Sequence, residues 1–261
     1  MQDVSIIIKT FERPRSLRRL LKSIAAHQPS CPVIVSDDSN RPSRNKMLAA
    51  FPSLALEYYE MPFDSGVCAG RNLTLSHVRT PYFVHCDDDF VFDSRADLAS
   101  ARDMLEQHGL DILAGLYYDV APMTPAQWLK AIARLELFRI KNRITMEGVP
   151  RRFFGNFAPN PDGTVRLVEI PYQDPLVRCD LGQNFFIART ERVRDTLGGW
   201  NEAIKIGGDH EDFFYRAKQA GLAVAQTERF GTIHYREMNS VYAAFRRRSK
   251  TYRPKIFEGW F

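Results

Sequence analysis

The chain has 261 residues, 44% of them hydrophobic, and a net charge of +5. This size and composition suffice for one large α/β domain with a buried core, or for two small domains packed closely together. No apolar run reaches the roughly 18 residues of a membrane span, and no basic segment precedes the first apolar run as it would in a signal peptide. We therefore expect a soluble domain, which excludes an integral membrane protein.

The four cysteines are Cys31, Cys68, Cys86 and Cys179, and no two of them form a C-x-x-C pair. A chain of this size without a secretion signal gives little reason to expect disulfides. We predict reduced, mostly buried thiols and hence a cytoplasmic location.

The first 116 residues alternate strand-like apolar runs with segments whose apolar residues recur at helical spacing. Strands are predicted at 6–8, 33–35, 56–59, 82–84 and 112–113, and helices from Pro14 to about 24 and near 43–51, 65–78 and 95–108. This βαβαβαβαβ order predicts an α/β fold with a mostly parallel sheet covered by helices on both faces. In such sheets, ligands bind beyond the carboxyl ends of the strands.

Residues 117–178 lose this alternation. A helical segment at 128–138 leads into a part rich in proline and glycine, where the sequence Asn-Pro-Asp-Gly at 160–163 predicts a hairpin turn. Regular structure returns with a strand at 185–187 and with a helix that opens after Gly207-Gly208 and ends near Gly221. We expect the irregular part to serve the acceptor side of a site.

Three adjacent carboxylates, Asp87-Asp88-Asp89, directly follow the strand predicted at 82–84. Their mutual repulsion is tolerable only if they are solvated or neutralised by a cation, and hard oxygen ligands favour Mg²⁺ or Mn²⁺. The alternative is an acidic surface turn, but apolar residues flank the triplet on both sides. The pattern therefore favours a metal site that would also hold a phosphate-bearing ligand.

Two further motifs fall where a nucleotide site is expected. Asp37-Asp38-Ser39 ends the second strand, where an α/β nucleotide site usually places an acid on ribose hydroxyls or a base edge. Arg71 lies in a helical segment after Gly66, from which an arginine can pair with phosphate or pack over a base. A capping turn before Pro42 is the alternative explanation of the acidic pair.

Asp209, His210, Glu211 and Asp212 crowd the start of the helix that follows Gly207-Gly208. The helix dipole stabilises carboxylates there, which explains them without catalysis. A functional interpretation needs one of them to accept the proton of a hydroxyl. Helical spacing predicts that Asp209 and Asp212 share one face and that the other two point elsewhere, so all four cannot reach one hydroxyl.

The C-terminal residues 242–261 combine cations with aromatic side chains. The cations are Arg246, Arg247, Arg248, Lys250, Arg253 and Lys255, and the interleaved rings include Phe245, Tyr252, Phe257, Trp260 and Phe261. This pattern suits a peripheral contact with an anionic membrane, and it suits nucleic acid less well. A tail folded back on the domain is the alternative.

Taken together and in this order, the motifs resemble those of inverting GT-A glycosyltransferases, particularly family 2 and its relatives that transfer N-acetylgalactosamine or galactose. The resemblance covers residues 4–236 except 117–178. Ile7 to Pro14 resemble the family's first strand and nucleotide loop, and Asp37-Asp38-Ser39 resemble its nucleoside acid. Gly66 to Asn72 match its G-x-x-x-A-R-N segment with Gly70 in place of the alanine, and Asp87-Asp88-Asp89 match its D-x-D motif. Asn184 to Thr190 and Gly199 to Glu202 resemble the strand and the loop before the acidic helix.

This resemblance implies one Rossmann-like domain with a nucleotide-sugar-binding half (1–116), an acceptor-binding and catalytic half (117–241) and a basic aromatic tail (242–261). It implies a UDP-sugar donor, a glycan or lipid-linked acceptor, no nucleic acid, and Mn²⁺ or Mg²⁺ bound by Asp87, Asp89 and His234. The donor would contact Thr10, Phe11, Glu12, Arg13, Asp37, Asp38, Arg71, Asp87 and Asp88.

The catalytic base stays open between two alignments. The family pattern G-E-D-x-D-[LIF]-x-x-R, aligned on Arg216, places Asp209 and His210 at its first two acidic positions and Asp212 at the later one. The literal His210-Glu211-Asp212 instead matches a looser x-E-D pattern with Asp212 as base. The resemblance favours a carboxylate of the cluster over the histidine.

Other classes fit the sequence less well. A haloacid dehalogenase-type phosphatase would match Asp87-x-Asp89 loosely, but that motif normally ends the first strand, and here three βα units precede it. A sugar nucleotidyltransferase would need a glycine-rich first loop, which residues 10–14 do not provide. A non-catalytic module that binds sugars or nucleotides remains the alternative that only activity can separate.

Overall fold

The computed structural model describes residues 3–137, 149–237 and 239–257, so the end of the helix predicted at 128–138 and the tail residues Trp260 and Phe261 lie outside the described residues. The strands are β1 (Val4–Thr10), β2 (Val33–Asp37), β3 (Leu56–Glu60), β4 (Tyr82–Asp87), β5 (Phe90–Val91), β6 (Ile112–Val120), β7 (Val149–Arg151), β8 (Gly155–Pro159), β9 (Val165–Glu169), β10 (Val177–Arg178), β11 (Phe186–Arg189) and β12 (Val224–Tyr235). The helices are α1 (Pro14–His27), α2 (Arg44–Ala50), α3 (Val67–Ser76), α4 (Leu98–Gln107), α5 (Pro125–Ala133), η1 (Arg192–Thr196), α7 (Asp209–Gln219), α8 (Ser240–Arg246), α9 (Ser249–Tyr252) and η2 (Lys255–Phe257).

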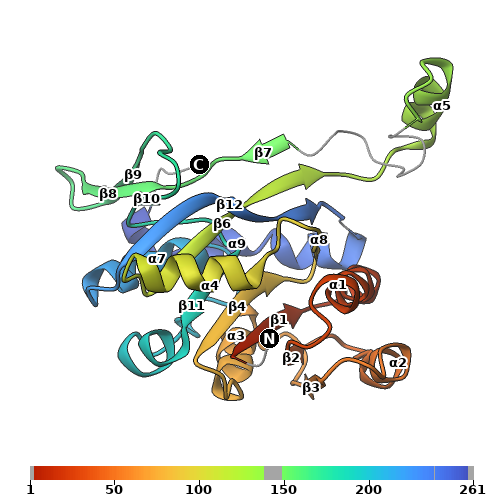
Figure 1. The fold of residues 1–261 in the computed structure, drawn as a ribbon, viewed down its shortest axis with the longest axis horizontal. Helices are drawn as coiled ribbons and strands as arrows, with labels where there is room; N and C mark the ends of the chain where they lie inside the picture. The colour runs from red at the N-terminus through yellow and green to blue at the C-terminus, as the bar shows by residue number, and fades with distance from the viewer. Residues whose placement is uncertain (1–2, 138–148, 238, 258–261) are drawn as a thin grey trace.

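One large sheet organises the domain (Figure 1), with the strand order β10-β12-β6-β11-β4-β1-β2-β3 and with β5 and β7 paired to β12 and β6. The pairs among β1, β2, β3 and β4 are parallel, as is β6 with β12, whereas β11 runs antiparallel to both of its neighbours. The predicted mostly parallel α/β sheet is confirmed. The boundary placed at residue 116 falls inside β6, so the two halves share one sheet.

Side chains alternate across the sheet and form a core on each face, because successive strand residues point in opposite directions. Ile6 and Ile8 pack with Leu20 of α1 on one face, while Ile7 packs with residues of α3 and α7 on the other. Both faces are therefore covered, as predicted. All four cysteines are free and buried.

The irregular part contains the predicted hairpin: β8 and β9 pair antiparallel around the turn at residues 160–164. Within the described residues, no helix is long and apolar enough to cross a membrane.

The C-terminal segment folds back on the domain. The ring of Phe245 packs against Phe11 and Phe63, and Phe257, which is 1% exposed, packs against Phe157 and Tyr215. The expectation of a membrane contact through this tail is therefore not supported by the described residues, in which Phe257 is buried and Phe245 packs against other rings of the protein. We call residues 239–257 the C-terminal strap.

Candidate active site

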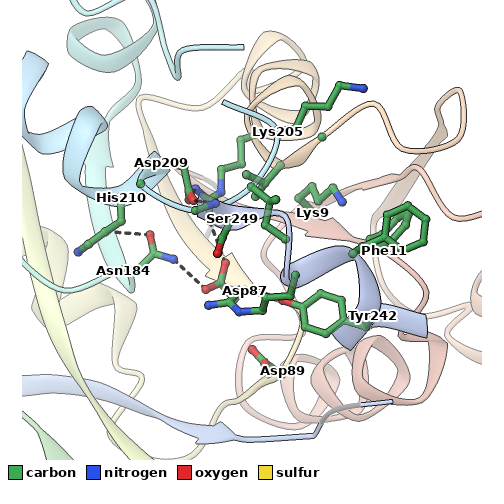
Figure 2. Close-up of a pocket in the computed structure, with 18 of the residues that line it drawn as sticks. Lys9, Phe11, Asp87, Asp89, Asn184, Lys205, Asp209, His210, Tyr242 and Ser249 are labelled. Atoms are coloured by element: carbon green, nitrogen blue, oxygen red, sulfur yellow. Dashed lines mark hydrogen bonds and ion pairs between the residues drawn. The ribbon is translucent and has the colours of Figure 1, made fainter. Parts of the chain in front are cut away.

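A cavity of about 540 Å³ lies at the carboxyl ends of the parallel strands and beneath the C-terminal strap (Figure 2). Because β1, β2 and β4 are parallel, their ends at Thr10, Asp37 and Asp87 meet at one edge of the sheet. The walls come from the loops after these strands, from residues 205–211, from β12 and from the strap. The volume of this cavity is in the range of sites that bind small organic ligands.

The structure brings only some of the predicted residues to this cavity. Those that line it are Phe11, Arg13, Asp38, Arg71, Asp87, Asp89, Asp209, His210, Glu211 and His234. Those that do not are Thr10, Glu12, Asp37, Asp88 and Asp212.

The aspartate triplet forms a tight turn between β4 and β5. Asp87 and Asp89 face the cavity, and Asp88 points the other way, where Thr10 Oγ1 donates to its carboxylate at 2.6 Å. Arg13 ion-pairs with Asp88 and, at 2.6 Å, with Asp89. Burial raises the pKa of Asp88 to about 6, whereas the pKa of Asp89 is lowered because Arg13 and His234 outweigh burial. Arg13, which the sequence analysis predicted only as a donor contact, is thus also the counter-ion of Asp88 and Asp89.

His234 is held between two carboxylates. Its Nε2 lies 3.4 Å from Asp89 Oδ2, and its Nδ1 lies 2.6 Å from Asp119 Oδ1. The parallel register of β6 and β12 sets His234 opposite Asp119, and the pairing of β12 with β5 sets it beside the triplet. Burial opposes a charge here, but the two carboxylates raise the pKa of His234 to about 9. Asp119 is a site residue that sequence reasoning missed.

The chemistry of Asp87, Asp89 and His234 suits a divalent cation, since it combines two carboxylates with an imidazole whose other nitrogen is fixed by Asp119. Among the described residues, however, no three such side chains converge closely enough to hold a metal ion. Asp87 instead ion-pairs with Arg71 at 3.1 Å, and Asp89 with Arg13. A cation at this wall would replace guanidinium groups as the partners of the two carboxylates.

The acidic pair after β2 divides between two tasks. Asp37 is buried and accepts hydrogen bonds from the backbone N–H of Ser39 and from the hydroxyl of Tyr58, so it holds the loop and does not reach the cavity. Asp38 lines the cavity, accepts from the N–H of Gly66 at 2.9 Å and pairs with Lys9 Nζ at 2.6 Å. The prediction of a donor contact thus fits the geometry of Asp38 and not that of Asp37.

Lys9 explains the departure of this chain from the family motif at Gly70. A Cβ atom at residue 70 would lie 2.5 Å from Lys9 Cγ and 2.9 Å from Ser36 Oγ. Lys9 lies over the ring of Phe11, and burial lowers the pKa of its ammonium. Glycine at position 70 therefore makes room for a buried lysine beside the site.

The glycine pair before α7 turns the chain into the cavity with φ values of +79° and +78°, which glycine adopts without strain. Asp209 ion-pairs with Arg71 at 2.5 Å; burial opposes its ionisation, but Arg71 outweighs burial and lowers the pKa of Asp209. Asp212 pairs with Arg216 at 2.8 Å, outside the cavity. Although helical spacing sets Asp209 and Asp212 on one face of α7, the cavity is lined by Asp209, His210 and Glu211 and not by Asp212.

Glu211 and His210 complete the first turn of α7 at the cavity wall. Glu211 is 7% exposed, and burial raises the pKa of its carboxyl. The ring of His210 contacts Phe214 edge-on, with 5.0 Å between ring centroids.

Asn184 links His210 to the aspartate triplet (Figure 2). Its Nδ2 donates to Asp87 Oδ2 at 2.8 Å, and its Oδ1 lies 3.2 Å from His210 Nδ1. A carboxylate only accepts, so the amide oxygen must face the imidazole and accept from an Nδ1–H group. In the neutral ring, Nε2 then carries the lone pair. Sequence reasoning gave Asn184 no role, because the antiparallel neighbourhood of β11 and β4 that sets it beside Asp87 cannot be read from the chain.

The C-terminal strap supplies cations to the cavity. Arg246, Arg248, Ser249 and Arg253 line it, together with Tyr242, whose ring faces the Arg13 guanidinium at 4.0 Å. Arg248 ion-pairs with Asp64 at 2.6 Å. With Lys9, Arg13 and Lys205 on the other walls, cations surround the cavity on several sides.

The mostly parallel sheet, with the aspartate triplet after β4 and a cationic cavity at the strand ends, has the GT-A fold of the glycosyltransferase structures that it resembles. The chain belongs to glycosyl transferase family 2, whose model matches residues 5–160. This match removes support from the phosphatase alternative.

Relatives and solved structures agree with this assignment. Beta-1,4 N-acetylgalactosaminyltransferase 1 of Homo sapiens is 35% identical over 193 residues, which are 74% of this chain and 32% of that protein. The chain thus spans about a third of the length of this relative. The structures of S. aureus TarS 1-349 in complex with UDP (TM-score 0.59, 17% identity, 90% of this chain and 61% of that one) and of GalNAc-T7 with UDP, GalNAc and Mn²⁺ (TM-score 0.63, 12% identity, 90% and 43%) share its fold.

Proposed function

We propose that this glycosyltransferase moves a sugar from a UDP donor to a hydroxyl of a glycan or lipid-linked acceptor, with inversion at the anomeric carbon and with help from Mn²⁺ or Mg²⁺. The observation that carries the proposal is the placement of Asp87, Asp89 and His210 on the walls of one cationic cavity. N-acetylgalactosamine is the first sugar to test, because the sequence relatives are named as N-acetylgalactosaminyltransferases.

The nucleoside part of the donor would bind beside β1 and β2. Phe11 lines this part of the cavity, and Asp38 offers a carboxylate for ribose hydroxyls or a base edge. The cations of the C-terminal strap and Arg13 would then face the diphosphate. Arginine suits this task, since its planar fork matches phosphate oxygens.

The metal would be held by Asp87, Asp89 and His234, and when bound it would neutralise charge on the leaving diphosphate. The chain's own residues prepare these ligands. Asp119 orients the imidazole of His234, and Asn184 orients the carboxylate of Asp87.

We infer that His210 is the general base, in preference to the carboxylates that surround it. Asp209 is neutralised by Arg71, and Asp212 lies outside the cavity in an ion pair with Arg216. Glu211 also lines the cavity, but the cations Arg246 and Arg253 favour its charged form and so oppose the rise in its pKa that burial causes. The hydrogen bonds from Asp87 through Asn184 favour the tautomer of His210 that has its lone pair on Nε2. A base that accepts a hydroxyl proton needs such a lone pair.

Incubation of the purified chain with a panel of nucleotide sugars and Mn²⁺ tests the proposal. We expect release of UDP from UDP-N-acetylgalactosamine or a related UDP-hexose, followed by product mass with an acceptor panel. Nucleotide binding without release from any donor, in the presence of any acceptor, would instead indicate a non-catalytic binding module.

Asp38 should serve donor binding more than chemistry. We expect Asp38→Asn to raise the donor KM by about tenfold, since a hydrogen bond to a charged group contributes about 1.5–3 kcal/mol, while kcat changes little. Asp37→Asn is the matched control: it should lower the melting temperature by weakening the loop and leave KM unchanged. A loss of kcat at constant KM in Asp38→Asn would point to a catalytic carboxylate.

A further inference from the structure

Helix α5 stands apart from the rest of the domain. Figure 1 shows it at the end of the connection that leaves β6, away from the sheet and its covering helices. Its start is stabilised locally by a capping box in which Thr124 and Gln127 exchange side-chain and backbone hydrogen bonds, followed by Pro125 at the first turn. The helix is therefore specified by its own sequence, and of its residues only Ala131 is buried.

The exposed surface of α5 is apolar. Five of the eight large hydrophobic side chains exposed in the described part of the chain lie in or just after α5: Trp128, Leu129, Ile132, Leu135 and Leu137. The first three share one helical face, and Leu129 is 63% exposed. Single exposed apolar residues need no explanation, but a cluster of them on one helix marks an interaction surface.

The charge of α5 indicates what this surface meets. Within α5 and its C-cap the charged side chains are Lys130 and Arg134, and Glu136 follows after the helix, between Leu135 and Leu137. The two cations each lie two residues from Ile132, which at about 100° per residue places both opposite the apolar face. A helix with Trp and Leu on one face and only cations on the other has the pattern of helices that lie in the interface of an anionic membrane.

A second copy of the chain fits this surface less well. Nine residues span about 14 Å at a rise of 1.5 Å each, so the apolar face offers only a few hundred Å². A stable protein interface buries about 800 Å² on each partner. A lipid surface needs no such area, since the apolar face enters the acyl boundary while the cations meet headgroups.

We propose that α5 anchors this protein to an anionic lipid surface through Trp128, Leu129 and Ile132, with Lys130 and Arg134 at the headgroups. The anchor lies next in the chain to β6, whose Tyr117 lines the cavity. The inference goes beyond sugar transfer and does not depend on it.

Co-sedimentation of the full chain with vesicles tests the anchor without any donor. Vesicles of equal parts phosphatidylglycerol and phosphatidylcholine should bind the protein, and vesicles of phosphatidylcholine alone should bind it at least about tenfold less tightly. Leu129→Glu should weaken binding to the anionic vesicles by about tenfold or more, because a buried leucine contributes about 1.5–3 kcal/mol. Val168→Glu, which changes an exposed valine on β9, is the matched control and should bind like the wild type.

Unchanged melting temperature and UDP affinity would show that Leu129→Glu still folds. Equal binding of wild type and Leu129→Glu to anionic vesicles would overturn the proposal, as would absence of vesicle binding. If Leu129→Glu altered only the mass measured by light scattering, the surface would belong to a contact between two copies, and the proposal would be wrong.

Discussion

Replacing His210 by glutamine should lower kcat by about 10²-fold or more, the contribution expected of a general base, while UDP affinity stays within about twofold. Glutamine keeps the size and a hydrogen-bonding group near Asn184, but it cannot accept a proton at neutral pH. The effect should fall on kcat because the residues proposed to contact the diphosphate and the nucleoside line other walls of the cavity. Steady-state kinetics with saturating donor, together with UDP binding by calorimetry, would measure both quantities.

Three neighbouring variants control this experiment. Asp212→Asn removes the charge of the ion pair with Arg216 outside the cavity, so it should reduce stability and leave kcat near the native value. Asp209→Asn should lower kcat only indirectly, because it removes the charge that pairs with Arg71. Glu211→Gln changes a residue that lines the cavity, and it should lower kcat less than His210→Gln does. A larger loss of kcat in Glu211→Gln than in His210→Gln would assign the base to the carboxylate.

Asn184→Asp separates the orienting role from catalysis itself. An aspartate at 184 loses the Nδ2–H donor that binds Asp87 and places two carboxylates in contact. The aspartate would still accept a hydrogen bond from the Nδ1–H group of His210. It would no longer be held in place by Asp87, so the position of the His210 ring would be less well fixed. We expect a lower kcat than in the wild type and a changed pH profile, which a merely structural role of Asn184 would not produce.

Much of the fold could be predicted from the sequence, because the elements of the first 116 residues are local patterns. The strands after them, such as β11 and β12, could be predicted as segments, but their place between or beside earlier strands could not. That place decides which side chains meet. His234 faces Asp119, and Asn184 faces Asp87, only because of pairings between residues more than 90 positions apart.

The acidic motifs show the same limit at the level of single side chains. Sequence reasoning selected Asp37 with Asp38 and all three residues of the triplet, since each run follows a strand. Which member faces the cavity depends on the turn after the strand, and the structure assigns Asp37 and Asp88 to inward hydrogen bonds. The tail was ambiguous for a different reason, because basic and aromatic residues suit a membrane and a cationic cavity equally.

The triplet also carries the second large prediction, which concerns the metal. We expect Mn²⁺ to tighten UDP binding to the wild type and a chelator to abolish this gain. Asp89→Asn should remove the gain as well, so that its UDP affinity in Mn²⁺ is about tenfold or more weaker than that of the wild type. Replacing a residue that only orients a metal ligand lowers metal affinity by about 10–100-fold, and replacing a ligand itself should lower it at least as much. Titration of UDP with and without Mn²⁺ measures the ratio directly.

Asp88→Asn provides a control within the same turn. It removes one negative charge that also pairs with Arg13, but its side chain faces away from the cavity. If the metal binds through Asp89, the gain from Mn²⁺ should survive in Asp88→Asn and disappear in Asp89→Asn, although both variants free one arm of Arg13. Equal loss in both variants would mean that the triplet acts through its total charge. If Mn²⁺ does not change the UDP affinity of the wild type, the metal has no place in the proposed mechanism. Asp89 would then keep its ion pair with Arg13 during the reaction.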